Sequence, residues 1–194
     1  MATVVVPFRS GGKSRLPADI RVEVALAMLG DVLEAAARFA PTRLVTTDPA
    51  ARLVAADLGV DLVDDPGGGQ GRAVQAALDG VDGPCLVVNA DLPRARPSDL
   101  AALAIPARAG RLAIVSAPDG TTNALGLPHG EVFQPLYGAG SAAQFRAHTL
   151  ALGLVYDDLG LPNLRDDVDT VIDLERVGRR SGPRTRALSA LVVT

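Results

Sequence analysis

Two groups of acidic residues, far apart in the chain, have the chemistry of a divalent-cation site. Asp91 follows an apolar run at 85–88, and Pro93 then prevents further strand pairing. Asp167 and Asp169 lie far downstream, just before a helical pattern that runs up to Val177. Carboxylate oxygens are the ligands that hard cations prefer. The sequence predicts a metal site if the fold brings the two groups together, although Asp91 alone could simply cap a turn.

A polar loop after the first apolar run combines two glycines with the bases Lys13 and Arg15. Glycines let backbone N–H groups approach phosphate oxygens, and the helix that follows directs its positive dipole end toward the same place. Lys13 would act as a point charge and Arg15 as a two-pronged donor on a polyphosphate. Pro7 stands where a P-loop needs glycine, which disfavours a P-loop enzyme. A solvated surface loop is the alternative interpretation.

Two further glycine-rich segments could face a ligand. Gly67, Gly68 and Gly69 follow a predicted strand and precede a helix, a position that favours ligand contact only slightly. The stretch 138–143 matches the G-x-G-x-x-A dinucleotide fingerprint, but a short segment with a proline precedes it instead of a strong strand. We interpret it as a helix N-terminus whose free N–H groups and Ser141 hydroxyl could bind one phosphate or carboxylate.

The elements that must position these residues alternate along the chain. Apolar and β-branched runs predict strands, whereas recurrences at three- and four-residue steps predict helices. Strands are expected at 3–8, 42–47, 60–63, the first half of 85–93, 112–117, 123–127 and 154–156. Helices are expected at about 20–38, between 48 and 59, up to Leu78, from Pro97, at about 141–152 and up to Val177. This order predicts an α/β fold with a doubly wound, mostly parallel sheet, interrupted by a hairpin at 112–127.

Composition narrows the classes of protein further. The 194 residues suit one domain, 1–194, and with four Phe, two Tyr and no Trp its core must be built from Ala, Val and Leu. A net charge of −3 without a basic run argues against a nucleic-acid polymer or an anionic membrane as partner. No membrane-length apolar run or signal pattern occurs, so a cytoplasmic protein is expected. Cys85 should be a small buried hydrophobe. The tail at 179–194 is either a docking helix or partly disordered.

Taken together, these segments resemble the 2-phospholactate and phosphoenolpyruvate guanylyltransferases of coenzyme F-420 biosynthesis. The resemblance covers residues 4–177 and rests on eight short motifs in the same order. They are Val6-Pro7 with Lys13-Ser14-Arg15-Leu16, Ala25–Leu29, Thr46–Pro49, Asp65–Gly69, Ala90–Pro93, Thr122–Leu125, Gly138–Ser141 and Asp167–Thr170.

The resemblance implies a Rossmann-like nucleotidyltransferase sheet akin to the glycosyltransferase-A fold. It implies Mg²⁺ as cofactor, and GTP and a small phosphorylated three-carbon acid as partners. It also leaves open a homodimer and the hand-over of an unstable product to the next enzyme. The roles it implies are metal ligation by Asp91, Asp167 and Asp169, triphosphate contacts by Lys13 and Arg15, a guanine and ribose pocket at Gly67–Gly69, and an acid anchor at Thr122, Gly138 and Ser141.

Some positions depart from the family pattern. The family usually reads Leu-Asn-Ala-Ala-Leu where this chain has 70–74, so Gly71 replaces an asparagine. Arg9 stands for a usual lysine, and Ala142 for an aromatic residue. The choice of nucleotide therefore stays open, as does the choice between the two acids. The sequence is also compatible with a nucleotidyltransferase for a sugar phosphate or molybdopterin, a non-catalytic nucleotide-binding protein, or a dinucleotide-dependent oxidoreductase.

Overall fold

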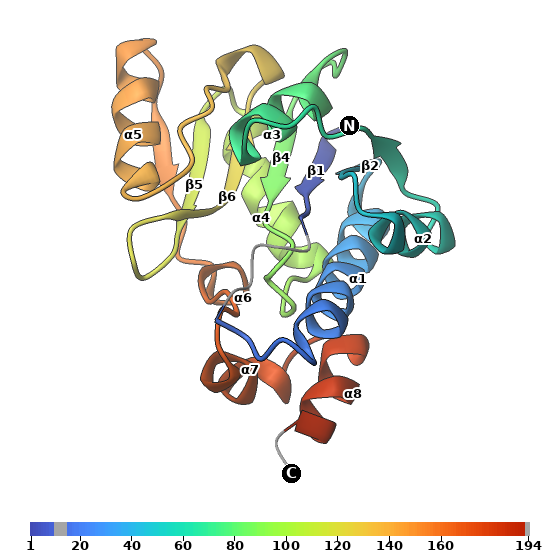
Figure 1. The fold of residues 1–194 in the computed structure, drawn as a ribbon. Helices are drawn as coiled ribbons and strands as arrows, with labels where there is room; N and C mark the ends of the chain where they lie inside the picture. Colours follow the sequence, from blue (N-terminus) through green and yellow to red (C-terminus); the bar gives the residue numbers. More distant parts are fainter. Residues whose placement is uncertain (10–14, 193–194) are drawn as a thin grey trace.

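A computed structural model describes residues 1–9 and 15–192 of the chain, and within them seven strands form one sheet (Figure 1). The strands are β1 (Thr3–Pro7), β2 (Thr42–Val45), β3 (Asp61–Val63), β4 (Cys85–Val88), β5 (Leu112–Ser116), β6 (Thr122–Leu127) and β7 (Tyr156–Asp158). Their order is β3-β2-β1-β4-β6-β5-β7. β6 is antiparallel to β4 and β5, and the other pairings are parallel. The predicted mostly parallel α/β sheet and its hairpin are confirmed.

Helices cover both faces of the sheet. They are α1 (Arg21–Phe39), α2 (Pro49–Asp57), α3 (Gln70–Leu78), α4 (Pro97–Arg108), α5 (Ser141–Ala151), α6 (Pro162–Arg165), α7 (Val171–Gly178) and α8 (Pro183–Val192), with a short 3-10 helix, η2 (Gly130–Val132). One apolar core contains Leu86 and Val88 and packs on α1, α2 and α4, whereas a second contains Val87 and packs on α3 and α5. Because successive strand residues point to opposite faces, a strand covered on both sides is apolar throughout.

The antiparallel strand β6 brings a polar residue to the ligand-binding edge of the sheet. Val88, the last residue of β4, pairs with Ala124, so the start of β6 at Thr122 lies beside the carboxyl end of β4. The backbone N–H of Asn89 continues this pairing by donating to the carbonyl of Asn123 at 3.0 Å. Ligands of open α/β sheets bind beyond these carboxyl ends. Thr122 and the loop after β4 therefore face the same crevice.

The segment after β7 returns from the far side of the sheet to this crevice. The side-chain Nδ2 of Asn123 donates to the carbonyl of Arg165 at 2.8 Å. Two residues beyond Asp166, the N–H of Val168 donates to the carbonyl of Asp91 at 3.2 Å. These bonds hold the segment with Asp167 and Asp169 across the carboxyl end of β4.

The C-terminal helix α8 packs against α1, below the sheet in Figure 1. Its first turn is capped from another element, because the buried carboxylate of Asp31 accepts hydrogen bonds from the N–H groups of Arg184 (3.0 Å) and Thr185 (2.9 Å). The Arg184 guanidinium also donates to Glu34 at 2.6 Å. The N–H of Gly182 donates to the carbonyl of Pro93 at 2.8 Å, so α8 is tied to the loop that carries Asp91.

Replacing Asp31 with alanine is expected to destabilise the fold. Two N–H groups in the first turn of α8 would lose their acceptor, which should cost about 2 kcal/mol and lower the Tm by about 4–8 °C. Thermal unfolding followed by circular dichroism measures the change. Glu23→Ala, at an exposed position of α1, the helix that carries Asp31, is the matched control and should shift the Tm little. An Asp31→Ala protein as stable as this control would contradict the role of the cap.

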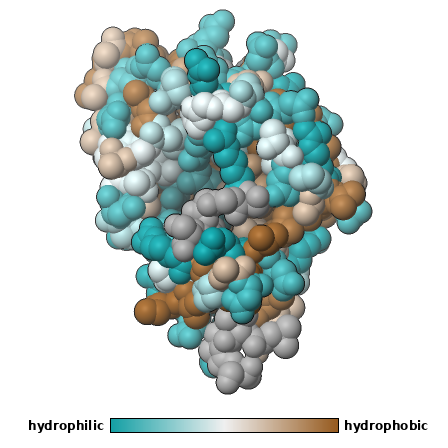
Figure 2. All heavy atoms as spheres, viewed as in Figure 1, coloured by the Kyte–Doolittle hydropathy of each residue, from teal (hydrophilic) through white to brown (hydrophobic). Residues whose placement is uncertain are grey.

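The face shown in Figure 2 is mostly polar, and its apolar residues lie in separate small groups. Large exposed apolar side chains occur on several elements, such as Leu53 on α2 and Ile105 on α4. Among the helices of residues 1–9 and 15–192, we find none with the length and apolar character needed to cross a membrane.

Candidate active site

Three carboxylates meet where the loop after β4 faces the returning C-terminal segment. One oxygen each from Asp91, Asp167 and Asp169 lies within 4.8 Å of the other two. All three side chains are half-buried. A set of oxygen donors with this charge fits a hard divalent cation. The predicted convergence of the two acidic groups is therefore present, and their role as metal ligands stays a prediction.

A guanidinium lies against this acidic cluster. Arg15 Nη2 is 2.5 Å from Asp169 Oδ2, and the Arg15 side chain is 68% exposed. Arg15 also contributes to a lowered pKa of Asp119, after the larger effect of hydrogen bonds that this carboxylate accepts from Thr121. Arg15 is therefore in direct contact with the acidic cluster and close enough to the β5–β6 turn to act on the charge of Asp119. Lys13, predicted to contact the same polyphosphate, lies outside the described residues.

Arg94 fixes the returning segment to the loop after β4. Its Nη2 donates to the carbonyl of Pro162 at 2.7 Å, and its Nη1 is 3.6 Å from Asp166 Oδ2. The side chain is only 12% exposed. Because Arg94 lies three residues after Asp91, and Asp166 immediately before Asp167, this contact helps to hold the carboxylates together.

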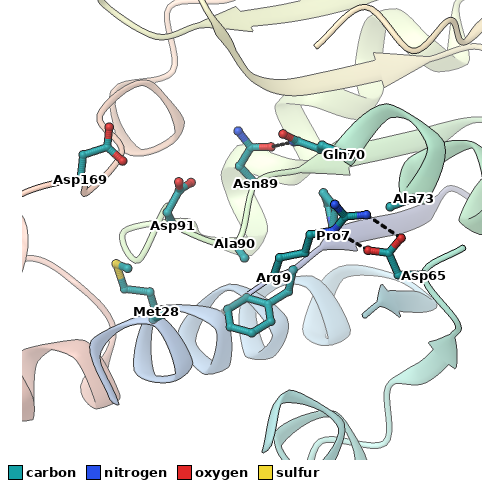
Figure 3. A pocket seen from close by; sticks show the side chains of 12 residues that line it. Pro7, Arg9, Met28, Asp65, Gln70, Ala73, Asn89, Ala90, Asp91 and Asp169 are labelled. Carbon is teal, nitrogen blue, oxygen red and sulfur yellow. Dashed lines mark hydrogen bonds and ion pairs between the residues drawn. The ribbon is translucent and has the colours of Figure 1, made fainter. Parts of the chain in front are cut away.

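A pocket of about 320 Å³ opens beside the carboxylates. Asp91 and Asp169 line one end, the pair of Arg9 and Asp65 lines the other, and Asn89 lies between them (Figure 3). The remaining lining residues are Pro7, Phe8, Ala25, Met28, Gln70, Ala73 and Ala90. The pocket is large enough for part of a nucleotide, with its charged end at the carboxylates.

At the far end of the pocket, Arg9 binds Asp65 with two parallel hydrogen bonds. Arg9 Nε is 2.6 Å from Asp65 Oδ2, and Nη2 is 2.8 Å from Oδ1. The Arg9 guanidinium, helped by the N–H of Gly67, holds the pKa of Asp65 below its usual value although burial acts in the opposite direction. This pair fixes the start of the glycine segment Gly67–Gly69, whose three residues all have positive φ angles (81°, 81° and 103°). Glycine adopts such positive φ angles without the steric strain that a side chain would cause.

The first turn of α3 lines the pocket midway between its two ends. Gln70 Nε2 donates to Asn89 Oδ1 at 2.7 Å, and Asn89 Nδ2 donates to the carbonyl of Thr122 at 3.2 Å. The sequence did not single out Gln70 or Asn89 as site residues. The available signal was position, since each follows a segment that was already expected to face the ligand.

Gly71 can carry no side chain in this structure. A Cβ there would lie 2.4 Å from Pro135 Cβ and 2.8 Å from Pro135 Cα. Because the second contact is with backbone, an asparagine could enter only if the segment before α5 moved. The departure from the family pattern at this position is therefore built into the packing.

The proposed acid anchor lies on the other side of Asn89. Ser141 Oγ donates to Thr122 Oγ1 at 3.0 Å, and both side chains are buried. Gly138 is exposed and accepts from the N–H of Ser141 at 3.1 Å, while the N–H of Ala142 donates to the carbonyl of Gly120 at 3.2 Å. The three predicted residues are neighbours. The expectation of free N–H groups at this helix start is wrong for Ser141 and Ala142, because the preceding turns supply acceptors.

Two alternative chemistries lose support from their surroundings. In the described part of the chain, the segment before the 138–143 fingerprint contains only η2, without the strand that a dinucleotide site needs. Burial raises the pKa of the Cys85 thiol to about 11, so this residue is a poor nucleophile. The prediction that Cys85 is a buried hydrophobe is confirmed.

Comparison with known proteins agrees with this geometry. Residues 10–153 match the MobA-like NTP transferase domain. A Salinispora arenicola protein named phosphoenolpyruvate guanylyltransferase is 38% identical over 96% of this chain and 92% of its own length. A Streptomyces scabiei protein of the same name is 36% identical over 97% and 95%. The structure of a nucleotidyl transferase from Methanothermobacter thermautotroptrophicus superposes with a TM-score of 0.66 at 17% identity, covering 91% of this chain and 95% of that one.

The sheet order, the antiparallel β6 and the carboxylates beyond β4 define a nucleotidyltransferase with a glycosyltransferase-A-like fold. The chain is therefore an enzyme of the nucleotidyltransferase class. It belongs to the phosphoenolpyruvate guanylyltransferase family and carries the MobA-like NTP transferase domain. The family resemblance predicted from the sequence motifs is confirmed.

Proposed function

We propose that this protein transfers GMP from GTP to phosphoenolpyruvate and releases pyrophosphate, as a step of coenzyme F-420 biosynthesis. The observation that carries the proposal is the cluster of Asp91, Asp167 and Asp169 at one end of a pocket that can hold part of a nucleotide, in a chain of this family. The names of its relatives favour phosphoenolpyruvate over 2-phospho-L-lactate.

In this reaction a phosphate oxygen of the acid attacks the α-phosphorus of GTP. A new P–O bond forms as the bond to the β-phosphate oxygen breaks, and pyrophosphate leaves with that electron pair. A phosphate monoester is already anionic near neutral pH, so the attacking group needs no general base. The protein's contribution is in-line positioning and neutralisation of charge. Arg15, beside the carboxylates, is suited to the triphosphate, and the Thr122, Gly138 and Ser141 region to the acid.

Mg²⁺ is the cofactor we propose for the three carboxylates. All donors are oxygen atoms, which suits Mg²⁺ better than a softer metal. When bound, the ion would neutralise negative charge on the phosphates. We also propose a cytoplasmic location, where nucleoside triphosphates are available. A homodimer and direct hand-over of the product remain predictions.

Mass spectrometry of the reaction products tests the proposal. The protein is incubated with GTP and Mg²⁺, and with phosphoenolpyruvate or 2-phospho-L-lactate in separate reactions. The expected result is a GMP adduct of phosphoenolpyruvate and one pyrophosphate per adduct. An adduct only with 2-phospho-L-lactate would change the acceptor. Absence of an adduct with either acid, while GTP binds, would contradict the guanylyltransferase assignment.

A further inference from the structure

The orientation of two side-chain amides in the pocket follows from a backbone carbonyl. The carbonyl of Thr122 can only accept a hydrogen bond, so the neighbouring Asn89 amide must direct its NH₂ group there. Asn89 Oδ1 then points to Gln70, which donates through Nε2 at 2.7 Å. The backbone of Asn89 is itself held by the carbonyl of Asn123 at 3.0 Å. Gln70 is thereby prevented from exchanging its oxygen and nitrogen positions without breaking a hydrogen bond.

This chain of bonds determines what Gln70 can offer to a ligand. Gln70 lines the pocket, between the carboxylate end and the Arg9–Asp65 pair (Figure 3). With Nε2 directed to Asn89, Oε1 is the acceptor that the amide presents. A fixed acceptor favours ligands that carry an N–H or O–H donor at that place, because an acceptor there would leave two lone pairs opposed.

Neighbouring polar groups are less able to present a fixed hydrogen-bond acceptor to a ligand. Both oxygens of Asp65 accept from Arg9, and Oδ1 also accepts from the N–H of Gly67 at 2.8 Å. Position 71 cannot carry an amide, because Pro135 occupies the space that a Cβ would take. On the first turn of α3, Gln70 is therefore the polar side chain directed to the pocket.

We propose that Gln70 determines nucleotide specificity by accepting a hydrogen bond, through Oε1, from the nucleoside part of the bound triphosphate, and that Asn89 is the residue that positions it. The donor is an N–H of guanine or the 2′-hydroxyl of ribose. This inference rests on the proposed function, because it assumes that GTP occupies the pocket with its phosphates at Asp91 and Asp169. Asn89 also contacts Thr122, so the same residue links the nucleotide pocket to the side proposed for the acid.

Steady-state kinetics of Gln70→Met test the proposal, with phosphoenolpyruvate as acceptor and GTP, ITP, ATP or 2′-deoxy-GTP as donor. Methionine keeps the length of the side chain and removes the acceptor. We expect kcat/KM for GTP to fall about 10- to 100-fold, mostly through KM, in proportion to one lost hydrogen bond in a pocket. The preference for GTP over one analogue should fall by a similar factor. That analogue is ITP or ATP if the donor is on guanine, and 2′-deoxy-GTP if it is on ribose.

Two further variants separate specificity from folding. Gln75→Met, at an exposed position of the same helix, should leave all four kcat/KM values unchanged. Asn89→Ala should reduce the same preference as Gln70→Met, because Gln70 would then be free to rotate. An equal loss of kcat/KM for all four nucleotides, or no loss with Gln70→Met, would overturn the inference while the unaltered protein remains active. An unaltered protein without activity on GTP would overturn the proposed function as well.

Discussion

Asp91→Asn is expected to lower kcat for pyrophosphate release from GTP and phosphoenolpyruvate by about a thousand-fold. The replacement keeps the shape of the side chain and removes one negative charge from a set of three carboxylates within 4.8 Å of one another. A divalent ion would lose a strong oxygen ligand, and the triphosphate would lose the charge that the ion supplies. A coupled pyrophosphate assay measures the rate. Titration with Mn²⁺, followed by electron paramagnetic resonance, should show weakened binding of the ion by the same variant.

Asp64→Asn is the matched control for this experiment. Asp64 lies on a loop at the same edge of the sheet, and its side chain is 86% exposed, paired with Arg52 at the surface. Both the rate and Mn²⁺ binding should stay within about twofold of the unaltered protein, since exposed ion pairs contribute little. An Asp91→Asn protein with the native rate would contradict the proposed site, whatever the result at positions 167 and 169.

The strands could be predicted where both faces are covered. At 4–6 and 86–88 the apolar side chains alternate between the two cores, so burial alone requires a continuous apolar run. The last strand was placed at 154–156 but spans Tyr156–Asp158, because it is an edge strand. Its register is set by pairing of Leu112 with Tyr156, and Leu154 packs against the core without joining the ladder. Apolar character indicated the burial of Leu154 and not the pairing.

The position of Asp91 could also be predicted, because it follows a strand and the carboxyl ends of parallel strands share one edge. That Asp167 and Asp169 join it was implied only by the family resemblance. The side chains between the carboxylates and the far end of the pocket could not be predicted. Arg9 and Asp65 are 56 residues apart, and Gln70 and Asn89 are 19 apart. Each pair depends on the relative position of two loops, which neither periodicity nor turn chemistry determines. The contact of Gly71 with Pro135 has the same origin. In the sequence it could be recognised only as a departure from a pattern.

Arg15→Met is expected to change activity and metal binding in opposite directions. In the structure the guanidinium is 2.5 Å from Asp169, where it neutralises a carboxylate that we assign to the metal ion. If Asp169 holds the ion as proposed, Arg15 would be available to a phosphate oxygen of GTP instead of to this carboxylate. Loss of that charge-assisted hydrogen bond should lower kcat/KM for GTP about 10- to 100-fold.

Mn²⁺ binding without nucleotide should instead become about two- to fivefold tighter in Arg15→Met, because an exposed ion pair no longer competes for Asp169. Arg111→Met is the matched control, since Arg111 forms a similar exposed pair with Asp157 at 2.9 Å and should affect neither measurement. Weaker Mn²⁺ binding in Arg15→Met would mean that Arg15 holds Asp169 in place for the ion. Competition would then be the wrong account of this contact, and loss of activity in the variant would report a misplaced carboxylate instead of a missing phosphate contact.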